Sequence, residues 1–121
     1  MELRAMPWHE SVIEAELAKT KILVNASALS NAGEQSPIPA ELLPPDLLVL
    51  DLMYMPRETK LMRDARAAGA AEVMNGDTML LHQTAAAFNL WTGRDFPLDF
   101  LQRRLDEVRE QRPAAAAPVG D

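Results

Sequence analysis

The sequence contains no cysteine, so it can form neither a disulfide nor a thiolate metal site. Its two histidines, His9 and His82, are far apart in the sequence, and we therefore expect no zinc site. No apolar run approaches the roughly 20 residues that a membrane-spanning helix needs, and the first residues do not resemble a signal peptide. These absences predict a cytoplasmic protein with neither a bound metal nor a membrane partner.

Basic residues and glycines are also sparse. The 12 lysines and arginines are outnumbered by 18 aspartates and glutamates, which gives a formal net charge of -6. Because phosphate contacts require clustered basic side chains, this scattered distribution argues against nucleic-acid binding. None of the 5 glycines forms a Gly-x-Gly-x-x-Gly dinucleotide loop. The 121 residues suffice for one small globular domain.

Apolar residues recur with helical and strand spacing in alternation along the chain. This spacing predicts strands over residues 22–25, 47–53 and 71–74, and helices over residues 10–19, 59–68, about 77–92 and 97–108. Residues 26–45 form a proline-containing loop with one helical turn around 40–43. The dipeptide Asn75-Gly76 would also suit a hairpin over residues 72–80, but the spacing of residues 79–91 favours a helix capped by Asp77 or Thr78.

Strands that alternate with helices predict a parallel sheet with right-handed crossovers. The near-continuous apolar run at residues 47–53 predicts a strand that is covered on both faces. Three strands, with a helix before the first, correspond to only the second half of a doubly wound sheet. We therefore predict a partial Rossmann-like α/β fold with flanking helices over residues 1–112, followed by a disordered Ala/Pro tail at 113–121.

One amide interrupts the apolar face of the third predicted helix. At helical spacing, that face carries Met79, Gln83, Ala86, Ala87 and Leu90. A buried amide without a partner costs about 1–3 kcal/mol, so we expect Gln83 to bind protein, water or a ligand. The face is therefore a candidate wall of a small-molecule site, and a hydrogen bond to a nearby backbone carbonyl is the alternative.

Four segments carry a family pattern. They are residues 22–27 (Ile-Leu-Val-Asn-Ala-Ser), 36–39 (Ser-Pro-Ile-Pro), 51–59 (beginning Asp-Leu-Met-Tyr-Met-Pro) and 76–93, which includes Gly76, Met79, Gln83 and Trp91-Thr92-Gly93. In order and spacing these segments resemble the C-terminal part of shikimate dehydrogenase. The resemblance implies an oxidoreductase of aromatic amino-acid biosynthesis that reduces 3-dehydroshikimate to shikimate with NADP. Residues 1–112 would then be an incomplete C-terminal NADP-binding domain that includes the two C-terminal helices.

The resemblance also implies roles for individual residues. For substrate binding it implies Tyr54 and Gln83, and for cofactor binding it implies Asn25, Ala26, Leu52, Gly76 and Met79. Ligands of open α/β sheets lie outside the carboxyl ends of the strands, where several of these residues fall. Core packing remains the alternative for Tyr54 and Met79.

Other polar positions receive simpler interpretations or depart from the family pattern. We expect Asp51 to cap neighbouring backbone groups and His82 to be solvated. Ser30 stands where the family has a glycine, which would cost about 1–2 kcal/mol if that position needs a positive φ. Asp77 and Thr78 replace the Leu-Gly of a common Gly-Leu-Gly-Met motif.

The family's catalytic Lys and Asp, its phosphate loop and its 2′-phosphate pocket belong to segments that this sequence does not contain. We therefore predict no catalytic residue in this chain, an incomplete NADP site without metal, and no activity without the N-terminal substrate domain and first Rossmann half. The strand at residues 22–25 would keep an unpaired edge and an uncovered apolar face.

The expected partners are shikimate or 3-dehydroshikimate, and either a separate N-terminal half or a second copy joined through the exposed strand edge. One alternative is a non-enzymatic binding or regulatory module that retains half of the ligand cleft. Another is an unrelated three-stranded α/β interaction protein.

Overall fold

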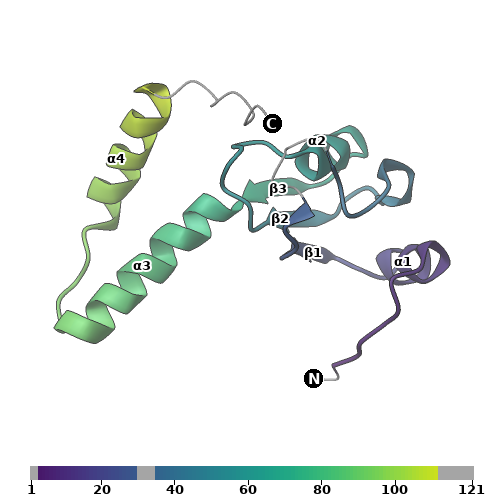
Figure 1. Cartoon of the computed structure of the whole chain (residues 1–121), viewed down its shortest axis with the longest axis horizontal. Coiled ribbons are helices and arrows are strands. Elements are labelled where there is room, and N and C mark those ends of the chain that lie inside the picture. Colours follow the sequence, from purple (N-terminus) through teal and green to yellow (C-terminus); the bar gives the residue numbers. More distant parts are fainter. Residues whose placement is uncertain (1–2, 30–34, 112–121) are drawn as a thin grey trace, which may run out of the picture.

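The computed structural model describes residues 3–29 and 35–111 of the chain. Along the sequence these residues form, as Figure 1 shows, α1 (Glu10–Leu17), β1 (Ile22–Asn25), the 3₁₀ turn η2 (Ala40–Leu42), β2 (Leu48–Asp51), α2 (Lys60–Ala67), β3 (Glu72–Asn75), α3 (Gly76–Thr92) and α4 (Leu98–Gln111). The predicted element order is confirmed, and so is the helix in place of a hairpin after β3. The predicted tail at 113–121 lies outside the described residues.

The three strands form one parallel sheet in the order β1-β2-β3. In its register Asn25 is opposite Asp51, and Asp51 is opposite Asn75, so the carboxyl ends of all three strands are aligned. Both connections run through a segment that returns to the opposite end of the sheet, which is the behaviour expected of a parallel α/β fold. The predicted partial Rossmann-like class is confirmed.

The core lies against one face of the sheet. Leu17 of α1, Val49 of β2 and Leu61 of α2 are almost fully buried, and they belong to a cluster that also contains Ile38, Leu43, Leu47 and Ala65. Helix α2 is well defined at both ends, because the Thr59 hydroxyl accepts a hydrogen bond from the Met62 amide and Gly69 has a φ of 87°. Each large apolar side chain buried here contributes about 1.5–3 kcal/mol.

The opposite face of the sheet is open. Leu48 and Leu50 of β2 are only half-buried, and the side chains of Ile22 and Val24 on β1 are 62% and 51% exposed. The prediction that the central strand is covered on both faces is therefore wrong, because the described residues place helices on one side only. The predicted free edge and uncovered apolar face of β1 are confirmed.

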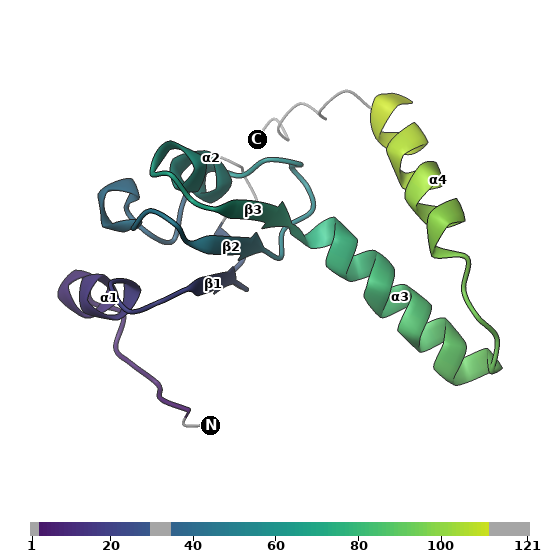
Figure 2. The same cartoon turned by 180° about the vertical axis from the view of Figure 1, so that it is seen from behind.

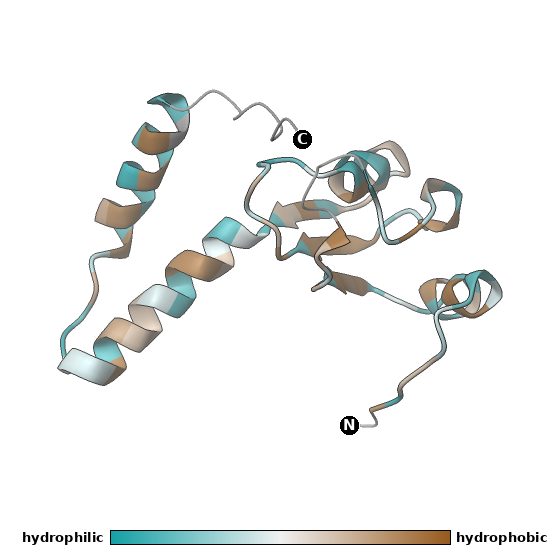
Figure 3. Ribbon diagram, in the orientation of Figure 1, coloured by the Kyte–Doolittle hydropathy of each residue, from teal (hydrophilic) through white to brown (hydrophobic). Residues whose placement is uncertain are grey.

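Helices α3 and α4 extend away from the sheet as a pair (Figures 1 and 2). The rings of Phe88 and Phe96 pack with centroids 4.9 Å apart at the turn between the two helices. Leu90 and Trp91 are each 81% exposed, and hydrophobic bands are visible along α3 in Figure 3. No helix in the described part of the chain is long and apolar enough to cross a membrane.

Candidate functional site

The site is built where the three strands end. Because β3 continues directly into α3, the first turn of α3 also lies at this end of the sheet (Figure 2). The cap of α3 is Asn75, whose side-chain oxygen accepts a hydrogen bond from the Asp77 amide. The expectation that Asp77 or Thr78 would be the cap is wrong, because Gly76 is already helical and no separate turn precedes the helix.

Asp51 is fully buried at the end of β2, and its carboxylate accepts hydrogen bonds from three different segments. Oδ1 accepts from the side-chain amide of Asn25 at 3.1 Å and from the backbone amide of Met53 at 3.1 Å. Oδ2 accepts from the hydroxyl of Thr59 at 2.7 Å. The predicted capping of a backbone group is confirmed, but two side-chain donors also bind this carboxylate, and nothing in the sequence indicated either.

Asn25 is 5% exposed and organises the loop after β1. Its Oδ1 accepts from the backbone amide of Ser27 at 3.0 Å and from the Ser27 hydroxyl at 2.8 Å, which forms an Asx turn. Ala26 lies between them with an exposed side chain. Asn25 therefore shapes the loop from inside while Ala26 faces outward; Ser30, where strain was expected, lies outside the described residues.

Gly76 is held against the backbone of the segment that follows β2. A Cβ at this position would lie 2.0 Å from the carbonyl oxygen of Leu52, and the Gly76 amide donates to the carbonyl of Met53 at 3.0 Å. The Leu52 amide in turn donates to the carbonyl of Asn25 at 3.0 Å. The structure thus brings Asn25, Leu52 and Gly76 together, and it explains the glycine by this close backbone crossing.

The other three predicted site residues face outward. Tyr54 is 50% exposed, Met79 is 38% exposed, and Gln83 is also exposed. The premise that Gln83 is a buried amide is therefore wrong for this chain, and neither Tyr54 nor Met79 belongs to its core. Gln83 lies two turns into α3, about 10 Å along the helix axis from Gly76 at 1.5 Å per residue. His82 is exposed, as expected.

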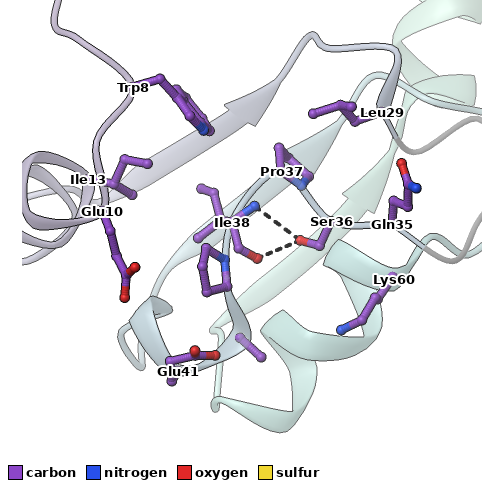
Figure 4. A pocket seen from close by; sticks show the side chains of 12 residues that line it. Trp8, Glu10, Ile13, Leu29, Gln35, Ser36, Pro37, Ile38, Glu41 and Lys60 are labelled. Carbon is purple, nitrogen blue, oxygen red and sulfur yellow. Dashed lines mark hydrogen bonds between the residues drawn. The ribbon is translucent and has the colours of Figure 1, made fainter.

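Two hollows of the described surface are lined by other residues. One of about 590 Å³ is lined by residues of α1, the segment after residue 34 and α2, among them Trp8, Ile38 and Lys60, and is seen close by in Figure 4. Another, of about 440 Å³, lies beside Arg57, Met74 and Thr78. Tyr54, Met79 and Gln83 line neither. The described residues contain no cluster of histidine, aspartate and glutamate that could hold a metal ion.

Comparison with known proteins shows which proteins this chain is similar to. Residues 78–104, which include Met79 and Gln83, match the family model described as the Shikimate 5'-dehydrogenase C-terminal domain. Among curated proteins, the shikimate dehydrogenase (NADP(+)) of Haloarcula marismortui is 47% identical over 91 residues, which are 75% of this chain and 34% of the relative. The enzyme of the same name from Streptococcus pneumoniae strain Hungary19A-6 is 42% identical over 98 residues, or 80% of this chain and 34% of the relative.

Solved structures agree with the sequence matches. A shikimate 5-dehydrogenase from Listeria monocytogenes in complex with shikimate and NAD aligns with a TM-score of 0.74 and 31% identity over 79% of this chain and 34% of that one. The Thermus thermophilus enzyme in complex with NADP(H) and shikimate aligns with a TM-score of 0.74 and 35% identity over 87% of this chain and 38% of that one. The chain spans about a third of the length of these relatives.

Proposed function

Because the chain belongs to the shikimate dehydrogenase family and matches its C-terminal part, we propose that it forms one wall of an NADP-dependent shikimate dehydrogenase. The observation that carries this proposal is the alignment of three strand ends with the first turn of α3, which together hold Asn25, Leu52 and Gly76. In open α/β sheets ligands lie at this end of the strands. The reaction would be the reduction of 3-dehydroshikimate to shikimate.

The exposed side chains at this end suit the two ligands. Ala26 and Met79 are exposed and Leu52 is half-buried, so together they offer an apolar surface to a nicotinamide ring. NADP would supply the hydride. Tyr54 and Gln83 offer a hydroxyl and an amide to the hydroxyl groups of shikimate, and both remain free for a ligand because both are exposed. The chain's own contribution is to bind and orient, since none of these residues is a strong acid or base.

The remaining part of the site would come from a complementary polypeptide. The open sheet face and the β1 edge, where Ile22 and Val24 are exposed, match what the first half of a doubly wound sheet would cover. Leu90 and Trp91 on α3 offer a second apolar surface. We infer that the chain alone is inactive, with an incomplete NADP site, and that the partner is an N-terminal half that supplies the acid–base groups; association of two copies through β1 is the alternative arrangement.

Coexpression tests the proposal. The chain is produced with the N-terminal two thirds of a shikimate dehydrogenase, and NADP-dependent oxidation of shikimate is measured for each part alone and for the pair. We expect turnover from the pair only. Gln83→Ala should reduce kcat/KM about tenfold, the effect of one lost hydrogen bond to the substrate. His82→Ala is the matched control, because His82 is the preceding residue on the same helix and is also exposed.

Two results would contradict this assignment. Turnover by the pair that does not respond to Gln83→Ala would remove the proposed substrate contact. Binding of shikimate or NADPH to the chain alone with a Kd below about 1 mM, without turnover in the pair, would favour a non-enzymatic binding module. The sequence feature that favours this second function is Ser30, which stands where the family has a glycine.

A further inference from the structure

Asp51 occupies a position that neither core packing nor ligand contact explains. Asp51 is 0% exposed. Val49, which lies on the same face of β2, is also 0% exposed and is apolar. An apolar residue would therefore fill this position at lower desolvation cost. The carboxylate lies where three hydrogen-bond donors converge, which indicates that accepting those three bonds is its function.

The bonds form a continuous path across the carboxyl end of the sheet. From the loop after β1, the Ser27 amide and hydroxyl donate to the Asn25 side-chain oxygen. The other end of that side chain donates to Asp51, which also accepts from the Met53 amide in the segment after β2. Thr59 then connects Asp51 to the start of α2, because its hydroxyl donates to Asp51 and accepts from Met62 at 3.3 Å.

The path joins the two sides of the proposed cleft. Ala26, assigned to the cofactor side, lies between Asn25 and Ser27. Tyr54, assigned to the substrate side, directly follows Met53. Both residues sit in irregular segments that follow strand ends. A backbone hydrogen bond from the Leu52 amide to the Asn25 carbonyl joins these segments, and the bonds to the Asp51 carboxylate add a second connection beyond it. A carboxylate suits this function because it only accepts hydrogen bonds and the three groups around it all donate.

We propose that Asp51 is a positioning residue that couples the loop after β1 to the segment after β2, so that the cofactor side and the substrate side of the cleft keep one relative arrangement. The coupling itself is a property of this chain alone. Its consequence for catalysis rests on the proposed function, and the two are tested by different measurements.

Native-state hydrogen exchange of the full chain tests the coupling without any variant. If Asp51 ties the loops together, the Ser27 and Met53 amides open in one event, so their exchange shows the same free energy and the same urea dependence. Different free energies with different urea dependences would overturn the proposal.

Four substitutions separate coupling from simple packing. Asp51→Ala should speed exchange at Ser27 and Met53 by about tenfold or more beyond the change in global stability. Val49→Ala, on the same strand and equally buried, is the control and should change both amides only by the global factor. Asp51→Asn keeps the oxygen that accepts from Asn25 and Met53 but sets an amide donor against the Thr59 hydroxyl. It should therefore restore both amides in part, to rates between those of the wild type and Asp51→Ala. Rescue by Asp51→Leu instead would show that volume alone matters and would overturn the proposal.

The assembled enzyme then shows the consequence for the reaction. Asp51→Ala should raise the KM for NADPH by more than it lowers kcat, because it displaces the loop that carries Ala26, whereas Val49→Ala should leave that ratio unchanged. An unchanged KM alongside faster exchange at both loops would contradict the link to the cofactor. If no pair of polypeptides gives turnover, the exchange result still decides the coupling, and the failure counts against the proposed function alone.

Discussion

Gly76→Ala tests whether the start of α3 is fixed by a backbone crossing. The new Cβ would lie 2.0 Å from the carbonyl oxygen of Leu52, 2.5 Å from its carbonyl carbon and 2.9 Å from its Cα. Real Cβ atoms essentially never approach a heavy atom closer than 3.0 Å, so the two segments must separate by about 1 Å. No side chain can rotate to relieve this contact, because all three atoms belong to the backbone.

Two opposing effects set the magnitude. Alanine is favoured over glycine inside a helix by about 1 kcal/mol. Overpacking of this kind costs about 1–3 kcal/mol or more, and separation also weakens the hydrogen bond from the Gly76 amide to Met53, which contributes about 0.5–1.5 kcal/mol. Because the steric and hydrogen-bond costs exceed the helix gain, we expect the free energy of unfolding to fall by about 1–3 kcal/mol.

Urea denaturation followed by circular dichroism measures this change. Ala86→Gly on the exposed surface of the same helix calibrates the helix preference and should cost about 1 kcal/mol. Gly93→Ala is a second control: its φ of 66° strains an alanine, yet a Cβ there meets nothing within 4 Å. It should cost about 1–2 kcal/mol without disturbing the carboxyl end of the sheet. A Gly76→Ala chain as stable as the wild type would refute the reasoning.

Two further predictions concern the open sheet face and the lowered pKa of one surface acid. Val24→Lys should change the free energy of unfolding by less than about 1 kcal/mol, because Val24 is 51% exposed. The same substitution should weaken assembly with the N-terminal part at least about tenfold in a pull-down titration. Ala67→Lys on the exposed side of α2 is the control, and equal binding by both variants would contradict the assigned interface. The hydrogen bond from Lys19 and the nearby charge of Arg4 hold the pKa of Glu16 below its usual 4.5, so its contribution to stability is present above the unfolded pKa and is lost as pH falls through the folded pKa. Lys19→Ala should raise the pKa of Glu16 in an NMR titration, and an unchanged titration would show that the ion pair does not form in solution.

Most of the fold could be predicted because its determinants are local. The spacing of Leu61, Met62 and Ala65 predicts both helix α2 and its inward face, and all three are buried. Gly69 and Gly93 predict the helix ends that their positive φ angles confirm. The cap of α3 is two or three residues earlier than predicted, because sequence alone does not show that β3 runs into the helix without an intervening turn.

The polar contacts at the candidate site could not be predicted from spacing. Asn25 is 26 residues before Asp51, and the parallel register sets the two side by side. Thr59 is 8 residues after Asp51 and reaches it as the cap of α2. A buried aspartate inside an apolar strand was the one available signal, and it indicated hydrogen bonding without naming the partners. The role of Gly76 was equally hidden, because the obstructing carbonyl of Leu52 lies 24 residues earlier in the sequence, in the segment that follows β2.

Helical spacing shows which residues share a face, but not what covers that face. The spacing of Met79, Gln83 and Leu90 predicted burial, yet Leu90 is 81% exposed and Gln83 is exposed as well. The same is true of the sheet, where an apolar run at β2 predicted two covered faces and the structure covers one. Both errors overestimate burial: in each case the described residues cover less of the apolar face than the sequence pattern predicted. The complementary polypeptide proposed above would account for both errors, because it would cover the open face of the sheet at Ile22 and Val24 and the surface of α3 at Leu90 and Trp91.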